Sequence, residues 1–335
     1  MATLKDIATA CGVSTASVSK ALHHAPDISA DTAERIRRTA KELGYHPNAA
    51  ARALKTNRTY NIGFLFKDES NMGFAHEYFS EVLAAAKEEA ESHGYDVSFI
   101  SRNIGPSKTG FLEHCNYRGY DGVLIVCIDF QNPEVAELIA SDIPVVTIDH
   151  VFDNRSSVIS DNVQGMRKLV EYIYSMGHRR IAYIHGEDTS VTRSRLASFH
   201  RTCKELGLQI SDEWVCEALY HDPKSSGLQT RKLLSLENSP TCILYPDDIS
   251  LLGGVTELEN QGLRVPEDIS VAGYDGALMS RVLRPVMTTM RQDSKTLGQK
   301  AASLLIEAIE EPKTYIPRMV MVPGELQTGG SVARI

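Results

Sequence analysis

After residue 60, short apolar runs alternate along the chain with segments of helical character. The apolar runs are only a few residues long and nearly unbroken, which is typical of strands buried on both faces of a sheet. They span 62–66, 122–128, 144–148, 181–185, 241–245 and 270–274. The helical segments between them span 80–92, 133–140, 162–176, 193–206, 225–236, 248–261 and 294–309. This alternation predicts an α/β core of parallel sheets covered by helices on both faces.

Residues 2–46 show a different pattern, with apolar positions at helical spacing and no strand-like alternation. The pattern predicts three helices over 4–11, 15–22 and 29–43, capped by Thr3, Ser14 and Ser29. Gly12 and Val13 form a tight turn between the first two, which gives a helix-turn-helix. The outward residues of the second helix are small or basic enough to enter a DNA major groove. They are Thr15, Ala16, Ser19 and Lys20. An ordinary three-helix packing module is the alternative at this point.

The segment that follows, AAARALKTNR at 49–58, favours DNA binding over simple packing. It is rich in alanine but too short to be a stable helix alone, so we expect it to fold only when something supports it. Ala51 and Leu54 lie on one face, and Leu54 is an apolar side chain among Arg52 and Lys55. An apolar wedge flanked by cations suits insertion into a minor groove, where it kinks the duplex.

The charge distribution agrees with a DNA-binding N-terminal region. The formal net charge is -8, but residues 1–58 hold nine Lys/Arg against five Asp/Glu, and the remainder holds 26 against 38. A basic N-terminal region on an otherwise acidic chain favours binding of an anionic polymer by that region. Small helical domains are also mildly basic without such a partner. The six cysteines are scattered among apolar runs, as reduced core residues are. No apolar signal region or membrane-length apolar stretch is present, so we expect a cytoplasmic protein.

Several motifs together resemble the LacI/GalR family of bacterial transcription regulators, in the order in which that family carries them. They are TLKDIATACGVSTASVSKAL at 3–22, ISADTAERIRRTAKELGYHPNAAARAL at 28–54, DGVLIV at 121–126, MGHRRIAYIHG at 176–186, GLRVPEDISVAGYD at 262–275 and TTMRQD at 288–293. The resemblance implies a small all-α helix-turn-helix domain over 1–46, a hinge helix and linker over 47–59, and a periplasmic-binding-protein-like core over 60–335. The core would have two doubly wound lobes, the first about 60–159 plus 291–320 and the second about 160–290 plus 321–335.

The resemblance also implies which residues contact a pseudopalindromic double-stranded DNA operator. Thr15, Ala16 and Lys20 would read bases. The residues near phosphates would be Thr3, Ser14, Ser19, Ser29 and Thr32. The hinge would contribute Asn48, Ala51 and the intercalating Leu54. His23 stands where the family often has Asn, and its imidazole can still donate a hydrogen bond to phosphate.

Ligands of open α/β sheets bind beyond the carboxyl ends of the strands, where this chain places several carboxylates. By resemblance, the residues that contact a small sugar-like effector are Asp149, Arg195 and Asp275, with Tyr78 and Phe79 as an aromatic platform and Asp247 where Asn is common. The alternatives are that a strand-end Asp caps the following helix, which we expect of Asp248, and that Tyr78 and Phe79 are core residues. Trp214 is expected at the start of a short strand, outside the pocket.

The main rival class is an enzyme, but the common catalytic and nucleotide-binding motifs are missing. His76-Glu77 lacks the second His of a zinc-binding helix. We therefore expect no catalytic residue, cofactor or metal. A secreted sugar-binding protein would explain only the core, and a nucleoid protein only the head. The ending GELQTGGSVARI has no apolar heptads of the kind that tetrameric family members carry, so we expect a homodimer. The identity of the effector, the sign of its effect and the operator sequence stay open.

Overall fold

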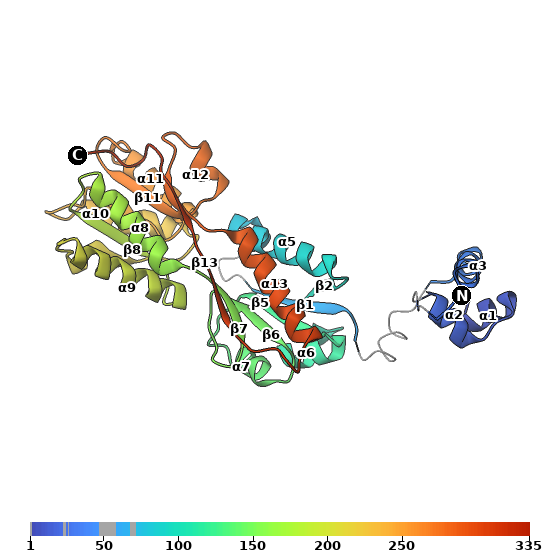
Figure 1. The fold of residues 1–335 in the computed structure, drawn as a ribbon. Helices are drawn as coiled ribbons and strands as arrows, with labels where there is room; N and C mark the ends of the chain where they lie inside the picture. Colours follow the sequence, from blue (N-terminus) through green and yellow to red (C-terminus); the bar gives the residue numbers. More distant parts are fainter. Residues whose placement is uncertain (1, 23–24, 26, 47–57, 68–71) are drawn as a thin grey trace. The chain divides into compact units, whose positions relative to one another are not determined.

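The computed structural model describes residues 2–22, 25, 27–46, 58–67 and 72–335. The chain divides into two compact units, residues 1–59 and residues 60–335 (Figure 1). Each unit has its own hydrophobic core, and each is described by itself.

The N-terminal unit consists of three helices, α1 (Leu4–Cys11), α2 (Thr15–Leu22) and α3 (Ala30–Glu42). The three predicted caps are present. Thr3 forms a capping box with Asp6, and the hydroxyls of Ser14 and Ser29 accept hydrogen bonds from backbone N–H groups at the starts of α2 and α3. Gly12 ends α1 in the left-handed conformation, with φ of 64°, which lets the chain turn directly into α2. The core of this unit centres on the fully buried Ile7, Val18 and Ile36.

The larger unit contains, within the described residues, two six-stranded sheets that are parallel except for one edge strand. The first has the order β13-β7-β6-β5-β1-β2. Its strands are β1 (Asn61–Phe66), β2 (Asp96–Phe99), β5 (Gly122–Cys127), β6 (Val145–Ile148), β7 (Ser156–Ser160) and β13 (Met319–Val322). The second has the order β14-β12-β11-β10-β8-β9, with β14 antiparallel. Its strands are β8 (Ile181–His185), β9 (Val215–Glu217), β10 (Cys242–Leu244), β11 (Ser270–Asp275), β12 (Thr288–Arg291) and β14 (Glu325–Gln327).

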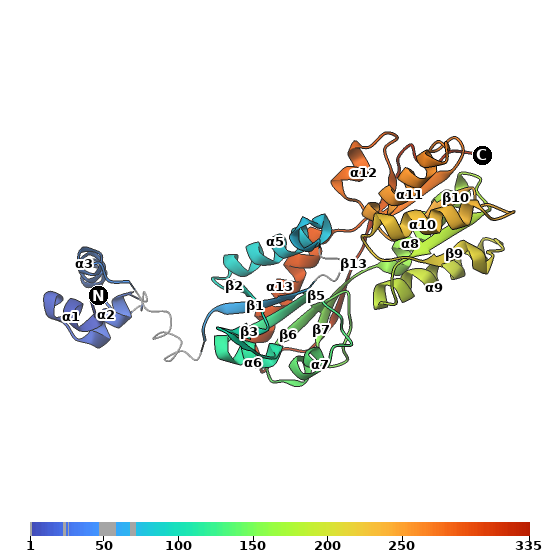
Figure 2. The ribbon, with the colours of Figure 1, turned by 180° about the vertical axis from the view of Figure 1, so that it is seen from behind.

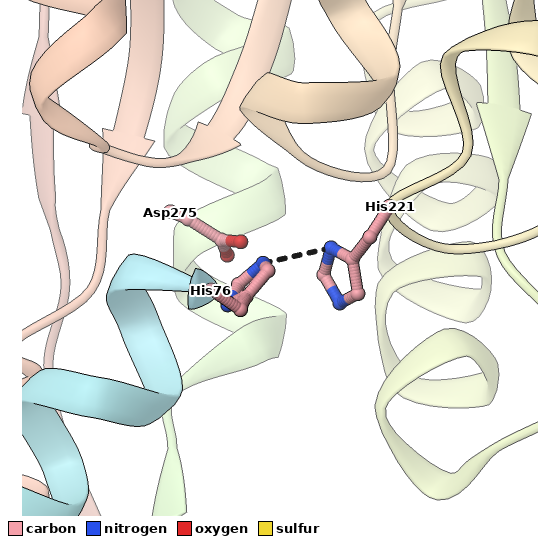
Figure 3. A group of neighbouring side chains, drawn as sticks. All are labelled: His76, His221 and Asp275. Carbon is pink, nitrogen blue, oxygen red and sulfur yellow. Dashed lines mark hydrogen bonds between the residues drawn. The ribbon is translucent and has the colours of Figure 1, made fainter. Parts of the chain in front are cut away.

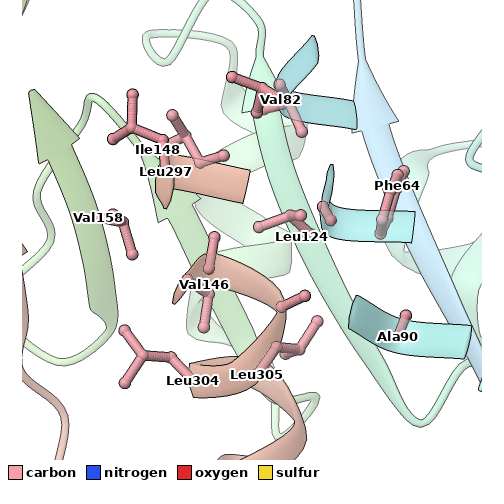
Figure 4. Close-up of a cluster of buried hydrophobic side chains, with 14 of the residues drawn as sticks. Phe64, Val82, Ala90, Leu124, Val146, Ile148, Val158, Leu297, Leu304 and Leu305 are labelled. Atoms are coloured by element: carbon pink, nitrogen blue, oxygen red, sulfur yellow. The ribbon is translucent and has the colours of Figure 1, made fainter. Parts of the chain in front are cut away.

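Helices cover both faces of each sheet, so that each sheet and its helices form one lobe. In the first lobe, α5 (Glu77–Ser92) and α13 (Ser294–Glu310) pack on one face, and α6 (Phe111–Arg118) and α7 (Pro133–Ala140) on the other (Figures 1 and 2). Figure 4 shows strand side chains such as Phe64, Leu124 and Val146 packed against Val82 of α5 and Leu305 of α13. In the second lobe, α8 (Asn162–Ser175) and α9 (Ser190–Glu205) cover one face, and α10 (Pro223–Leu234) and α11 (Asp248–Asn260) cover the other.

Three crossings join the lobes. The chain passes from β7 to α8 at 160–162, from β12 to α13 at 291–294, and from β13 to β14 at 322–325. The lobe boundaries that the resemblance implies, near 290 and 320, precede the second and third crossings by a few residues. The reason is that β12 pairs with β11 in the second sheet, while β13 pairs with β7 at the edge of the first. Such pairings depend on distant neighbours and leave no local signal.

The remaining elements are short. They are η1 (Gly73–Ala75), β3 (Asn103–Ile104), β4 (Ser107–Lys108), η2 (Asp212–Trp214) and α12 (Leu278–Val282). Trp214 therefore ends a 3-10 turn directly before β9, where a strand start was predicted, and its indole donates to the Asn238 carbonyl at 3.0 Å. Within the described part of the chain, no helix combines the length and apolar character needed to cross a membrane.

Candidate functional site

Unusual backbone conformations gather where the two lobes face each other. The structure describes four non-glycine residues with positive φ, and three of them, Asp149, His221 and Asp275, lie at the lobe boundary. Asp149 follows β6, Asp275 ends β11, and His221 precedes α10. Such conformations cost roughly 1–3 kcal/mol each and persist where the surrounding structure holds them, often at functional sites. These three positions therefore mark the region in which to look for a site.

A chain of hydrogen bonds connects the lobes through the first two crossings, and we call it the interlobe network. It comprises Tyr78, Asp149, Ser160, Gln292 and Asp275. The Tyr78 hydroxyl donates to Asp149 Oδ2 at 2.6 Å, and the Ser160 N–H donates to Asp149 Oδ1 at 2.8 Å. The Ser160 hydroxyl donates to Gln292 Oε1, and Gln292 Nε2 donates to Asp275 Oδ1 at 2.7 Å. The network thus joins Tyr78 and Asp149 of the first lobe to Asp275 of the second.

Both carboxyl groups of this network are poorly solvated. Burial raises the pKa of Asp149, although hydrogen bonds from Tyr78 and Ser160 partly offset the effect. Burial also raises the pKa of Asp275, and the charge of Arg195 partly offsets it. The described protein groups donate only to Oδ1 of Asp275, so its Oδ2 is available to a ligand.

Arg195 is buried in α9 and held from two directions. Its Nε donates to Asn162 Oδ1 at 2.7 Å, and its Nη1 donates to the Pro246 carbonyl at 3.0 Å. The guanidinium carbon lies 3.5 Å from the centroid of the Tyr274 ring, which is a cation–π contact. Among described residues, nothing accepts a hydrogen bond from Nη2. The guanidinium group is therefore held in place while its Nη2 can still donate to a ligand.

The two adjacent carboxylates after β10 differ from the expectation in which of them caps the next helix. Asp247, not Asp248, caps α11: its Oδ1 accepts from the Ser250 N–H at 2.7 Å, and its Oδ2 accepts from the Ser250 hydroxyl and the His221 N–H. Asp247 is the cap because its backbone is still extended, whereas Asp248 is already helical. Burial opposes the charge of Asp247, but hydrogen bonds and charge from His221 and the bonds from Ser250 lower its pKa to about 2.

Two histidines that the sequence did not assign to the site meet between the lobes. His76 Nε2 and His221 Nδ1 are 2.8 Å apart and share a hydrogen bond (Figure 3). The two histidines stand 145 positions apart in the chain, so no local motif links them. His221 lies just beyond β9, so the rule of examining strand ends could have found it. Phe79 packs beside His76, with ring centroids 5.1 Å apart.

A cavity of about 110 Å³ opens between the lobes and is lined by both. Of the predicted ligand residues, Tyr78 and Asp275 line it, together with the unpredicted His76, Asp248 and Gln292. The other predicted residues do not line this cavity: Phe79, Asp149, Arg195 and Asp247. Asp149 reaches it through its bond to Tyr78. Ser160, Asn162 and Gln292 lie in the crossings, whose approximate position the resemblance implied without singling out these side chains.

In the N-terminal unit, the predicted DNA contacts fall into three groups. Thr15, Ala16 and Lys20 are exposed on α2, and Lys20 forms an ion pair with Asp27. Thr3, Ser14, Ser29 and Thr32 lie at helix starts, with Ser19 on α2. His23, Asn48, Ala51 and Leu54 lie outside the described residues.

Comparison with known proteins identifies the family. Residues 3–48 match the profile of bacterial regulatory proteins of the lacI family, and residues 170–332 match a periplasmic binding protein-like domain. The HTH-type transcriptional repressor PurR of Pasteurella multocida is 32% identical over 317 residues, 93% of each chain. The chain belongs to the LacI family of bacterial regulatory proteins. It is a DNA-binding transcriptional repressor with the two-part fold that the sequence predicts.

Solved structures agree with this assignment. The Lac repressor dimer bound to operator and the anti-inducer ONPF is 28% identical, covers 99% of each chain and superposes with a TM-score of 0.81. The complex of the transcriptional regulator CelR with cellobiose is 25% identical, covers 99% of this LacI-family chain and 100% of its own, and has a TM-score of 0.70. The homologues are repressors, not enzymes.

Proposed function

We propose that this repressor changes its operator affinity when a small, sugar-like effector binds between the lobes. The observation that carries the proposal is the interlobe network, because a ligand that engages it contacts both lobes and two crossings at once. A ligand shifts a conformational equilibrium by as much as its affinities for the two arrangements differ, and such coupling is typically about 1–3 kcal/mol. The complex of CelR with the disaccharide cellobiose supports this class.

The proposed contacts follow from the donors and acceptors that the described protein leaves unused. Asp275 Oδ2 accepts from ligand hydroxyls, and Arg195 Nη2 donates to ligand oxygens. Tyr78 and Asp149 form a polar pair on the first lobe, and Phe79 adds an aromatic side chain beside them. Asp247 acts mainly by holding the backbone of His221.

On the DNA side, we propose a cytoplasmic homodimer that places two copies of α2 on a pseudopalindromic operator. Thr15, Ala16 and Lys20 read bases, and Lys20 exchanges Asp27 for DNA on binding. Thr3, Ser14, Ser19, His23, Ser29 and Thr32 contact phosphates. Asn48, Ala51 and Leu54 form the hinge, which folds on the DNA, with Leu54 wedged into the minor groove.

The effector site is tested by a thermal-shift screen against mono- and disaccharides, followed by gel shift with each hit. Arg195→Ala should abolish the effect of the hit on operator binding and leave operator binding without ligand intact. Arg193→Ala is the matched control, because Arg193 lies on the same helix but is exposed and paired with Asp188. If Arg195→Ala kept the full ligand response, the pocket assignment would be wrong.

The hinge is tested separately. Leu54→Ala should weaken operator binding by about tenfold or more and reduce the bend of the DNA, because the wedge no longer unstacks a base step. Leu43→Ala is the control, since Leu43 is a half-exposed leucine at the end of α3. Gel shift with a circularly permuted operator measures affinity and bend together. Unchanged values for both would contradict the wedge role.

A further inference from the structure

Three side chains from separate segments converge between the lobes, and of the three the proposed effector contacts use only Asp275. His76 comes from the start of α5 in the first lobe, His221 from the loop before α10 in the second lobe, and Asp275 from the end of β11. One ligand atom of each lies within 4.8 Å of the others. In Figure 3 the Asp275 carboxylate points toward the His76 ring, and the two imidazoles face each other. We call these three residues the interlobe cluster.

The donor set is one that first-row transition metals prefer. Imidazole nitrogen suits zinc, copper, nickel and iron, and carboxylate oxygen completes many such sites. Two nitrogens bound to one tetrahedral zinc lie about 3.3 Å apart, given bonds of about 2.0–2.1 Å. His76 Nε2 and His221 Nδ1 are already 2.8 Å apart, so a small separation of the rings would admit an ion. Asp275 Oδ2 receives no donor from the described protein and can serve as the third ligand.

The surroundings hold these side chains in place. His221 and Asp275 keep left-handed backbone conformations, with φ of 57° and 97°. His76 stands at the N-cap position of α5, yet its side chain makes no capping hydrogen bond to the helix and its ring instead faces His221.

Nearby carboxylates supply the charge that a cation needs. Asp247 Oδ1 lies 3.5 Å from His221 Nδ1, and Asp247 Oδ2 accepts from the His221 N–H. Asp247 therefore fixes the backbone of His221 and places a carboxylate oxygen beside the proposed ligand nitrogen. Asp247 and the cluster member Asp275 thus offer two carboxyl groups to an ion at this place.

We propose that the interlobe cluster binds one divalent first-row transition-metal cation through His76 Nε2, His221 Nδ1 and Asp275 Oδ2. Because its ligands come from both lobes, the ion links them and favours the closed arrangement of the core. His76 and Asp275 line the cavity, so water or an effector oxygen from the cavity can complete the coordination. The regulatory consequence rests on the proposed function, whereas metal binding itself does not.

The test uses the full chain without a histidine tag, stripped with a chelator and titrated with Co²⁺ as the probe. We expect one equivalent per chain by calorimetry, with visible absorption bands of a low-symmetry Co²⁺ site, and no comparable binding of Mg²⁺, which prefers oxygen ligands. The variants are His76→Gln and His221→Asn, since Asn tolerates positive φ. Each should weaken Co²⁺ binding by at least about tenfold. His93→Gln, an exposed histidine at the end of α5, should change nothing.

Circular dichroism of each variant keeps a folding defect from being taken for a lost ligand. Failure of the wild-type chain to bind Co²⁺ would overturn the proposal, and so would binding that both variants retain. Operator gel shift on the same samples separates this outcome from the proposed function. A chain that binds Co²⁺ but whose operator affinity does not respond to sugar argues against the proposed effector switch alone, and one that responds to sugar without binding Co²⁺ argues against the metal site alone.

Discussion

At the scale of single residues, Asp247 and Asp248 show how one peptide bond separates opposite electrostatic environments. Both are nearly fully buried. Asp247 accepts several hydrogen bonds, and its pKa falls to about 2. Burial and the charge of Asp275 raise the pKa of Asp248, and its Oδ1 finds no hydrogen-bond partner among the described residues. The sequence shows two carboxylates after an apolar run, but only the folded structure distinguishes them.

This contrast predicts opposite effects of two matched substitutions on stability. The lowered pKa of Asp247 means that its charged form stabilises the folded state above pH 3.8, and this contribution is lost as the pH falls toward 2. Asp247→Asn should therefore reduce the free energy of unfolding by roughly 2 kcal/mol at pH 7 and by less near pH 3. The pKa of Asp248 is raised in the folded state, so the sign is opposite. The protonated carboxyl group of Asp248 favours the folded state fully below pH 3.8, and this contribution to the free energy of unfolding is lost as the pH rises. Asp248→Asn should therefore raise the melting temperature at pH 7 and not at pH 3.5. Thermal unfolding across this pH range measures both, and equal effects of the two variants would contradict the assignment.

The sequence predicts only part of the candidate site from single residues. Carboxylates after apolar runs pointed to Asp149 and Asp275, and the family resemblance added Arg195 and Tyr78. The structure brings Tyr78, Asp149 and Asp275 into one hydrogen-bonded network. Nothing local in the sequence indicates that Gln292 bridges two of them, or that His76 meets His221. Those contacts arise only when two lobes and three crossings are assembled.

At the scale of elements, unbroken apolar patterns predicted the central strands and most helices closely. The segment 133–140 coincides with α7, and 181–185 coincides with β8. The pattern missed several short elements, among them the edge strands β2 and β13, the interior strand β7 and the helix α6. β2 has no buried residue and β13 has one, β7 begins with two serines, and polar residues make up half of α6. Their identity depends on pairing partners far along the chain.

The packing of α5 against α13 predicts the effect of one glycine substitution. Ala is favoured over Gly inside a helix by about 1 kcal/mol, which alone would make Gly298→Ala stabilising. A Cβ at Gly298, however, would lie 2.2 Å from the Val82 carbonyl oxygen and 2.9 Å from the Ala86 nitrogen, so the two helices would have to separate. We expect a net loss of about 1–3 kcal/mol. Lys300→Ala, at an exposed position of α13, is the control in denaturant unfolding, and a gain in stability at Gly298 would refute the close approach.

At the scale of the whole molecule, ligand-dependent switching requires that the lobes have two arrangements. Only a few contacts should differ between these two arrangements. Several described hydrogen bonds connect the lobes. They include the interlobe network, the His76–His221 pair, the bond from the Ser190 hydroxyl to the Asp149 carbonyl, and a contact between Glu77 and α12. Hydrogen bonds of this kind contribute about 1 kcal/mol each and exchange readily with water. Such a boundary can open and close, whereas the apolar core within each lobe cannot.

Glu77 offers the clearest test of this view, because it lies at the rim and contacts the other lobe. Its two carboxylate oxygens accept from the Leu278 N–H at 3.0 and 2.8 Å, at the start of α12. Removing this contact lowers the population of the closed core, and apparent effector affinity falls by the same factor. We expect Glu77→Ala to weaken effector binding by about two- to fivefold, since a charge at an exposed helix start stabilises by roughly 0.3–1 kcal/mol. Glu89→Ala is the control, because Glu89 lies on the same helix but binds Ser303 within the first lobe. Calorimetry with the effector found by the sugar screen measures both, and equal affinities for Glu77→Ala and the wild type would mean that closure does not depend on this contact.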